Sequence, residues 1–390
     1  MVIKYKHYSL FVVTFMLSIL LLTSGSLVVV DPLQLFHKPW VRDNYYINEL
    51  RFQAAGIINH DDFDSIILGT SFAANFSAEE ASDIWNTKFV NISPSGSWLS
   101  ERSVILNYAL SKKALKHVVM SLDGFDMSMN QKLTFPISNY DFLYNQSRLD
   151  DLKIYSNEKY LDYLLCENVI FVETACESTK SLEMVAEWGS DIEESRRFGG
   201  LENWFKAIDN GQVKQGLISI AKNTRAIKNG EVKNLDKTEI EKRLKAQEAS
   251  FERYLLPHLK QNPNTSFHLF FPPVSRMLQG YKIQVRPDDF DLYLDRIRYV
   301  IRVVEALPNV KVYAFDNLEF TNNIDLYKDS VHYSGEINSA ILMWMRHEYY
   351  QLNRDNVEQY IDVTSQLARN FDTVAFGEQI ISFLQENALF

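Results

Sequence analysis

The sequence has few cysteines and too few basic residues to balance its acids. Two cysteines, Cys166 and Cys176, occur in 390 residues, and no histidine stands close to them. Because a structural zinc site needs four Cys or His ligands, we predict no metal, and no motif indicates a cofactor. Lys and Arg total 40 against 50 Asp and Glu, a net charge of −10. Nucleic-acid-binding proteins are normally basic, so this balance argues against a nucleic-acid partner.

Charge is also missing from residues 8–30, whose sequence is YSLFVVTFMLSILLLTSGSLVVV. About 20 consecutive apolar residues span a bilayer as a helix. Lys4 and Lys6 precede the run and Asp31 follows it, so the positive-inside rule predicts a cytoplasmic N-terminus and an exported remainder. A cleaved signal peptide, cut near residues 24–26, is the alternative, but the length of the run favours an uncleaved anchor. We therefore predict a single-pass protein of the inner or plasma membrane, with its main domain in the periplasm or outside the cell.

Export would place both cysteines in an oxidising compartment. There Cys166 and Cys176 could form a disulfide that closes a small loop. Two reduced, buried thiols are equally compatible with the sequence, and the spacing of the cysteines does not decide between these states.

Short apolar runs alternate with helix-length patterns through most of the chain after residue 60. Helical patterns occur, for example, at residues 98–110 and 289–306. Strands that are apolar on both faces and alternate with helices indicate an α/β fold with a parallel sheet covered on both sides. The runs suited to buried strands are residues 65–68, 89–92, 117–122, 266–271 and 310–315.

The same pattern divides the chain into segments. Residues from about 125 to 262 are richer in charge and are predicted to be a mainly helical insertion. We expect its Lys and Arg residues on solvated helix faces; a lid or a docking surface for an anionic polymer is the alternative. The predicted segments are a cytoplasmic stub and transmembrane anchor at 1–30, a juxtamembrane stalk at 31–60, an α/β domain at 61–352 that contains the insertion, and C-terminal helices at 353–390.

The first predicted strand ends in Gly69, Thr70 and Ser71, within the sequence IILGTSFAANF. Ligands bind beyond the carboxyl ends of the strands in an open parallel sheet. Glycine permits a tight turn there, and a serine at the start of the next helix could attack a carbonyl while its own N–H helps to hold the oxyanion. The alternative is that Thr70 or Ser71 only caps the helix.

Two further segments are predicted to reach the same edge of the sheet. Asp329 and His332 follow the last predicted strand. A nucleophilic serine needs a base, and a base histidine needs an acceptor that fixes its tautomer, which an Asp three residues earlier can supply. Gly96 follows the second strand, and its N–H could be a second oxyanion donor; an ordinary turn is the alternative. The hypothesis depends on the joint placement of these residues, because each motif alone is common.

Three short motifs, in their order and spacing, resemble blocks one, two and five of the SGNH (GDSL-like) hydrolase superfamily: Gly69-x-Ser71, Gly96 and Asp329-x-x-His332. The resemblance covers residues 63–125 and 264–350. It implies a flavodoxin-like three-layer α/β fold with a Ser–His–Asp triad. With the predicted anchor and stalk, the chain is similar to the membrane-anchored envelope branch, such as the D-alanyl transfer protein of teichoic-acid modification and the SGNH proteins of alginate O-acetylation.

The chain departs from the family in the third block. That block normally supplies an Asn after the third strand to complete the oxyanion hole, whereas this chain has Asp123 within MSLDGFD. A carboxylate facing an oxyanion would destabilise it, and the loss of one donor costs on the order of 3 kcal/mol of transition-state stabilisation. Asp123 is therefore expected to orient a nucleophile or a donor loop, or to bind substrate hydroxyls.

The resemblance implies an acyltransferase or esterase in which Ser71 is the nucleophile, His332 the general base and acid, and Asp329 the orienting carboxylate. The N–H groups of Ser71 and Gly96 would form the oxyanion hole. The implied substrate is an acylated envelope polysaccharide, teichoic acid or lipid-linked glycan, with a multi-pass O-acyltransferase as the partner that supplies acyl groups. A non-catalytic polymer-binding or assembly component is the alternative, and a plain lipase or thioesterase is a third class.

Overall fold

The computed structural model describes residues 2–40, 44, 46–47, 49–125, 136–156 and 182–389. Cys166 and Cys176 lie outside these residues, so both states of the two thiols stay open. The chain forms two compact units, residues 1–62 with 136–182, and residues 63–135 with 183–390. The segment predicted as an insertion therefore contributes to both units.

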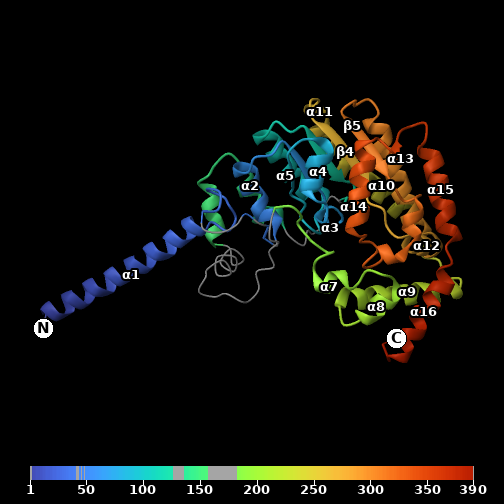
Figure 1. The fold of residues 1–390 in the computed structure, drawn as a ribbon, viewed down its shortest axis with the longest axis horizontal. Coiled ribbons are helices and arrows are strands. Elements are labelled where there is room, and N and C mark those ends of the chain that lie inside the picture. Colours follow the sequence, from blue (N-terminus) through green and yellow to red (C-terminus); the bar gives the residue numbers. More distant parts are fainter. Residues whose placement is uncertain are drawn as a thin grey trace. The chain divides into compact units, whose positions relative to one another are not determined.

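The first unit is helical in its described part (Figure 1). The helix α2 begins after Glu49, whose carboxylate accepts the Arg51 N–H at 3.2 Å. The Tyr144 hydroxyl donates to the Arg51 carbonyl at 2.8 Å, so η2 packs against α2 within this unit. The elements of this unit are α1 (Val2–Val30), α2 (Leu50–His60), η1 (Ile137–Asn139), η2 (Asp141–Tyr144) and η3 (Asp150–Ser156).

The helix α1 contains residues 8–30, for which a transmembrane segment is predicted, and it runs without a break. Within the part of the chain that the structure describes, no helix is long and apolar enough to cross a membrane. The fold therefore gives the predicted transmembrane segment no support.

The second unit is built around a six-stranded sheet. The strands are β1 (Ser65–Leu68), β2 (Phe89–Asn91), β3 (His117–Ser121), β4 (Ser266–Phe271), β5 (Val310–Ala314) and β6 (Gln351–Leu352). They lie in the order β2-β1-β3-β4-β5-β6; β1 to β5 run parallel, and β6 runs antiparallel to β5. The predicted α/β class and the five parallel strands are confirmed. No prediction covers β6, because two residues are too short to show a repeating pattern.

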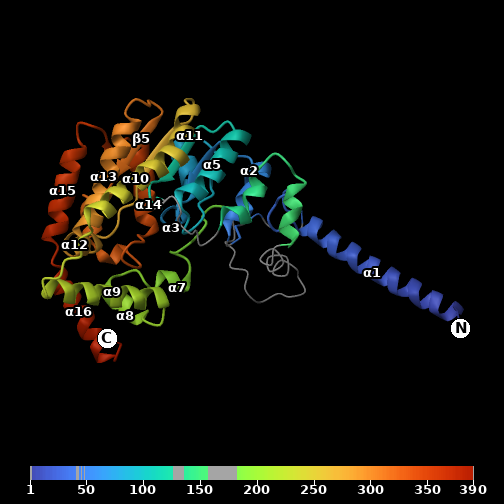
Figure 2. The same cartoon turned by 180° about the vertical axis from the view of Figure 1, so that it is seen from behind.

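Helices cover both faces of this sheet (Figure 1, Figure 2). The connections β1 to β2 and β2 to β3 run in opposite directions across the sheet, so right-handed crossovers put α4 and α5 on opposite faces. α14 packs beside α4, while α10 packs beside both α5 and α13. The helices of this unit are α3 (Ser71–Ala74), α4 (Ala78–Trp85), α5 (Leu99–Lys112), α7 (Ile192–Ser195), α8 (Leu201–Lys206), α9 (Gly211–Lys228), α10 (Lys237–Tyr254), α11 (Leu256–Gln261), α12 (Arg276–Val285), α13 (Pro287–Val304), η5 (Glu319–Asn322), η6 (Ile324–Leu326), α14 (Gly335–Arg346), α15 (Val357–Asn370) and α16 (Thr373–Glu386).

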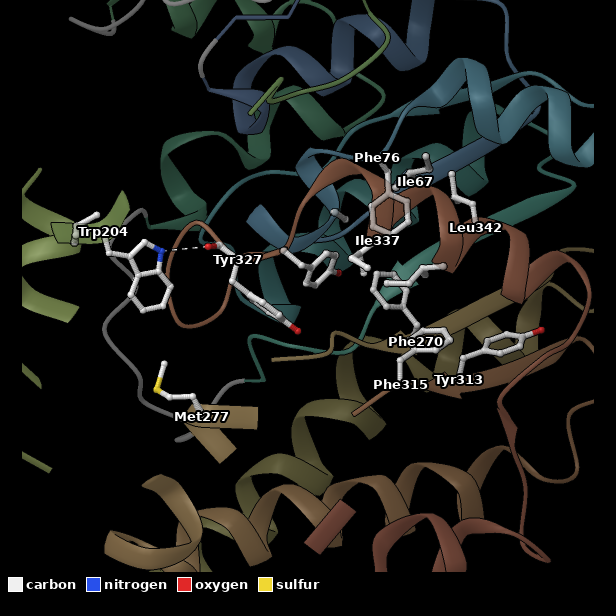
Figure 3. Packing of buried hydrophobic residues seen from close by; sticks show 14 of the residues in the cluster. Ile67, Phe76, Trp204, Phe270, Met277, Tyr313, Phe315, Tyr327, Ile337 and Leu342 are labelled. Atoms are coloured by element: carbon white, nitrogen blue, oxygen red, sulfur yellow. Dashed lines mark hydrogen bonds between the residues drawn. The ribbon is translucent and has the colours of Figure 1, made fainter. Parts of the chain in front are cut away.

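Large apolar side chains fill the space between the sheet and α14 (Figure 3). The helix contributes Ile337 and Leu342 to this cluster. The cluster members from the four central strands are Ile67, Val119, Phe270 and Tyr313. Burial of such side chains is the main favourable term in folding, and here it holds β1, β3, β4 and β5 in register, so that the loops after these strands share one edge.

Two histidines lie side by side in β3 and β4. His117 Nδ1 is 3.2 Å from His268 Nε2, and the Trp85 ring packs edge-on against His268 with centroids 5.5 Å apart. The pKa of His268 falls from 6.5 to about 3, mainly because the ring is buried, with smaller contributions from the neighbouring His117, Lys311 and Arg346. Burial also lowers the pKa of His117. Both rings are therefore neutral in the folded protein at pH 7.

The buried histidines predict that the fold is sensitive to acid. Because the pKa of His268 is lower in the folded chain than in the unfolded chain, its contribution to stability is complete above pH 6.5 and is lost as the pH falls below 6.5. Between pH 7.5 and 5 the free energy of unfolding should fall by about 2 kcal/mol through this group, as measured by urea denaturation. His268→Gln should flatten that dependence, and His347→Gln, at an exposed position, should not. Equal pH dependence in the two variants would contradict the prediction.

Candidate functional site

The corner that follows β1 brings Ser71 to the carboxyl-end edge of the sheet. No side chain would fit at position 69, because a Cβ atom there would lie 2.5 Å from Ser121 Oγ and 2.5 Å from Ala73 Cβ. The Gly69 N–H donates to Ser93 Oγ, in the loop after β2, at 2.9 Å. The glycine therefore permits a close approach to β3, and the corner is held against β3 and the loop after β2.

Thr70 caps α3, which leaves the Ser71 hydroxyl available. Thr70 Oγ1 accepts the Phe72 N–H at 3.4 Å. Ser71 Oγ lies 2.9 Å from Nε2 of His332. Of the two interpretations of this segment, the capping role falls to Thr70, and Ser71 faces a base.

Asp329 holds His332 within a single loop. Asp329 Oδ2 lies 2.7 Å from His332 Nδ1. The other carboxylate oxygen, Oδ1, accepts the backbone N–H groups of Val331 and His332, both at 2.9 Å. When Nδ1 of a neutral imidazole donates to a carboxylate, Nε2 is left as the acceptor. The ring is therefore oriented to take a proton from Ser71.

Contacts from other elements hold this loop in place. Its two ends pair through an isolated β-bridge between Tyr327 and Tyr333. The Ser275 hydroxyl, in the loop after β4, donates to the Ser330 carbonyl at 2.7 Å. Trp204 of α8 donates its indole N–H to the Tyr327 carbonyl at 3.2 Å (Figure 3). The segment after β4 and the helix α8 thus hold the loop in place together.

A buried arginine contacts the carboxylate of the same loop. Arg197 Nη2 lies 3.4 Å from Asp329 Oδ2, and the Arg197 side chain is 1% exposed. Its Nη1 pairs with Glu194 Oε1 at 2.9 Å. Burial alone would raise the pKa of Asp329, but the hydrogen bonds from the His332 ring and from the N–H groups of His332 and Val331 outweigh it and lower the pKa to about 2. Asp329 is therefore ionised at neutral pH.

Aromatic rings pack against His332 on two sides. The Trp188 ring meets it edge-on with centroids 5.1 Å apart, and the Phe72 ring lies tilted at 5.4 Å. Lys328 Nζ sits 3.6 Å from the centroid of the Trp188 ring and pairs with Glu194 at 2.5 Å. The His332 side chain remains 20% exposed, so the ring can still be reached from solvent.

Asp123 accepts hydrogen bonds from hydroxyls on both sides of the corner. Thr70 Oγ1 donates to its Oδ2 and Ser121 Oγ to its Oδ1, both at 2.5 Å. The fully buried Arg102 lies 3.7 Å from the same Oδ1 and donates to the Ser121 carbonyl at 2.6 Å. The carboxylate thus anchors the residue that precedes Ser71. Of the roles predicted for Asp123, these contacts fit the orientation of the nucleophile.

Gly96 lies in an exposed turn of the loop after β2. Its φ of +62° is in the region that favours glycine, and a side chain there would meet no atom within 4 Å. The Ser97 hydroxyl ties this loop to the corner by donating to the Gly69 carbonyl at 3.4 Å. No acceptor among the described residues binds the N–H of Ser71 or of Gly96. Within the described residues, the two predicted oxyanion donors are therefore left without a protein acceptor.

Metal-ligating side chains do not cluster in the described part of the chain, where no three His, Cys, Asp or Glu residues are placed to hold one ion. Asp123, a carboxylate beside the corner, is occupied by hydroxyl donors and faces a guanidinium.

Sequence patterns do not predict that Trp188 and Arg197 lie beside His332 and Asp329. The segment that carries Trp188 is bonded to the chain around α3: the Ala186 N–H donates to the Ala74 carbonyl at 3.0 Å, and the Trp188 N–H donates to Asn75 Oδ1 at 3.2 Å. The second of these bonds joins residues 113 positions apart, so no local period reveals it. The expectation that the insertion carries its Lys and Arg residues on solvated faces is wrong for Arg197, which pairs with carboxylates in the interior.

No protein-family model and no curated protein matches the chain. Its function is therefore inferred from its own residues and their contacts.

Replacing Asp123 by Asn should weaken the corner. An amide has one acceptor oxygen and one donor nitrogen, so either the Thr70 or the Ser121 hydroxyl would lose its acceptor. An unpaired buried polar group costs about 1–3 kcal/mol, and the free energy of unfolding measured by chemical denaturation should fall by that amount. Asp83→Asn, at an exposed position of α4, is the matched control and should change stability by no more than about 0.5 kcal/mol. A loss no larger than that of the control would show that Asp123 does not anchor the corner.

Proposed function

We propose that the chain is an SGNH-type acyltransferase or esterase with a flavodoxin-like fold. The observation that carries this proposal is the path of hydrogen bonds from Ser71 Oγ through His332 to Asp329, at 2.9 and 2.7 Å. The parallel strands follow the order 2-1-3-4-5, which is the flavodoxin-like order, and ligands bind such sheets where the winding reverses, between β1 and β3. Ser71 follows β1 and so lies at that point.

In the first half-reaction, Ser71 Oγ attacks the carbonyl carbon of an ester and gives its proton to His332 Nε2. The bond from Oγ to the carbonyl carbon forms. When the tetrahedral intermediate collapses, the bond between that carbon and the alcohol oxygen breaks. The alcohol leaves with the proton from His332, and the acyl group stays on Ser71.

In the second half-reaction, the hydroxyl of an acceptor attacks the carbonyl carbon of acyl-Ser71 and gives its proton to His332. The bond to Ser71 Oγ then breaks, and His332 returns the proton to that oxygen. An acceptor hydroxyl completes a transfer, whereas water in its place completes a hydrolysis. Both outcomes use the same groups, so exclusion of water from the site decides between them.

Charge develops at two places during this reaction: on the His332 ring and on the carbonyl oxygen of the ester. Asp329 stabilises the imidazolium of His332, and its pKa of about 2 keeps it ionised throughout. The N–H groups of Ser71 and Gly96 are the proposed oxyanion donors. Because Asp123 replaces a third donor, the site lacks on the order of 3 kcal/mol of transition-state stabilisation. We therefore expect slow turnover of simple esters.

The proposed substrate is an acyl ester of an envelope polysaccharide, teichoic acid or lipid-linked glycan. A multi-pass O-acyltransferase is the proposed partner that supplies the acyl group. This part of the proposal rests on the resemblance of the motifs and on the predicted anchor. A neighbouring gene for such an acyltransferase, or for a carrier-protein ligase, would support it, and neighbours from unrelated pathways would argue against it.

The membrane location is a separate part of the proposal and rests on residues 4–31. The helix α1 exposes large apolar side chains, for example Phe11 and Leu21 at 68% and 72%, and such surfaces favour burial in lipid or against another chain. The full-length protein should therefore sediment with membranes and resist extraction by alkaline carbonate. Recovery of the full chain in the soluble fraction would overturn the location and leave the catalytic proposal intact.

The second candidate is a non-catalytic component that uses the same fold to bind an envelope polymer. Asp123 favours this candidate, because the oxyanion hole lacks the donor that an Asn would supply. The hydrogen-bonded set of Ser71, His332 and Asp329 argues against it, since a binding module has no need of an activated serine.

Ser71→Ala should abolish covalent labelling by a fluorophosphonate probe. The probe reacts with a serine whose proton can pass to a base, so wild-type protein should be labelled in a gel-based assay. Ser95→Ala, at an exposed position of the loop after β2, is the control and should be labelled like the wild type.

Two results of that assay would overturn parts of the proposal. Undiminished labelling of Ser71→Ala would show that Ser71 is not the nucleophile. The wild type could show neither labelling nor turnover of acetyl or D-alanyl esters and still bind an envelope polymer measurably. That result would establish the second candidate instead.

A further inference from the structure

A pocket of about 140 Å³ lies beside the loop that carries Asp329 and His332. Residues 328–332 form one wall, and α8 and α9 form the other. The apolar side chains of the second wall are each at most 6% exposed. They are Trp204, Val213, Leu217 and Ile220.

The charged groups at this pocket already have partners. Lys328 pairs with Glu194 at 2.5 Å, and Asp329 pairs with His332 at 2.7 Å. The alcohol side of the proposed substrates carries many hydroxyls, and burying hydroxyls without hydrogen-bond partners is unfavourable. The pocket therefore suits an apolar part of the substrate, which in an acylated glycan is the acyl group.

Gly216 keeps the α9 wall open. It lies within an 18-residue helix, where glycine is among the least favourable residues. Gly216 lines the pocket, and a Cβ atom at this position would meet no atom within 4 Å. The volume of the pocket thus depends on the absence of a side chain at position 216.

We propose that this pocket receives the acyl group of the ester, as a chain of about four to six carbons, because a cavity of about 150 Å³ holds a benzene molecule. The inference rests on the proposed function. The acyl group would be attached to Ser71 Oγ, 2.9 Å from His332 Nε2, and His332 itself lines the pocket. An acyl chain attached to Ser71 therefore begins next to His332, which is part of the pocket wall.

The test compares p-nitrophenyl acetate, butyrate, hexanoate and decanoate on the full-length protein. For the wild type, kcat/KM should rise about fourfold per methylene from acetate to hexanoate, the factor that corresponds to burial of one methylene, and should fall at decanoate. Gly216→Leu should lower the hexanoate-to-acetate ratio about tenfold or more. Gly216→Ala should give an intermediate ratio. Gln215→Leu, which adds the same side chain at an exposed neighbouring position, should keep the wild-type ratio.

A binding measurement makes the pocket testable without catalysis. Sodium hexanoate should raise the melting temperature of the wild type and of Gln215→Leu, because a ligand that binds the folded state stabilises it. It should not raise that of Gly216→Leu. Leucine and alanine are better helix formers than glycine, so these variants should fold, and diisopropyl fluorophosphate labelling of Ser71 gives the active fraction of each.

The outcomes separate the pocket from the proposed function. Hexanoate binding that Gly216→Leu abolishes, without labelling or turnover in the wild type, would retain the pocket as an apolar ligand site and overturn the proposed function. Turnover with an unchanged hexanoate-to-acetate ratio in Gly216→Leu would overturn the acyl assignment alone. An equal loss for all four esters would also overturn it, since the shared alcohol would then be the group that the pocket contacts.

Discussion

The Asp329 carboxylate is the contact on which the site depends. One oxygen binds the His332 ring and the other binds the backbone N–H groups of Val331 and His332, so a single residue sets both the loop and the orientation of the base. These bonds also keep the group ionised, because they outweigh the effect of burial on its pKa. Without this carboxylate, His332 would lose the acceptor that directs Nε2 toward Ser71, and the loop would lose two of its hydrogen bonds.

The parallel sheet brings Ser71 to the loop that Asp329 organises. The loops after β1, β3 and β5 lie at the same edge because the strands are parallel and in register. At that edge Ser71 meets a base from the far end of the chain, while Asp123 anchors the preceding Thr70. Position 123 thus carries an anchor of the corner. These bonds explain how the corner is ordered with Asp at the position where the resemblance predicts an Asn.

The segment between β3 and β4 builds much of what surrounds the base. Trp188 packs on His332, Arg197 pairs with Asp329, and α9 forms the apolar wall of the neighbouring pocket. The carboxyl-end edge of a parallel sheet is by itself open to solvent. Under the proposed function, a wall of this kind would reduce the access of water and shape the pocket for one acyl group rather than another.

The amino-acid sequence by itself determined the five parallel strands, the tight corner at Gly69 and the Asp329-x-x-His332 loop. The strands follow from apolar runs and the loop from an Asp that binds its own backbone, and both involve residues close in the chain. A glycine between a strand and a helix indicates the corner, although the Ser121 contact that excludes a side chain there comes from β3. Only the tertiary structure decided that Thr70 rather than Ser71 caps the helix and that Arg197 is buried against Asp329. It also placed α9 beside the loop and added the short strand β6. These features depend on contacts between segments that are distant in the chain. Local residue patterns do not predict which distant segments will pack together.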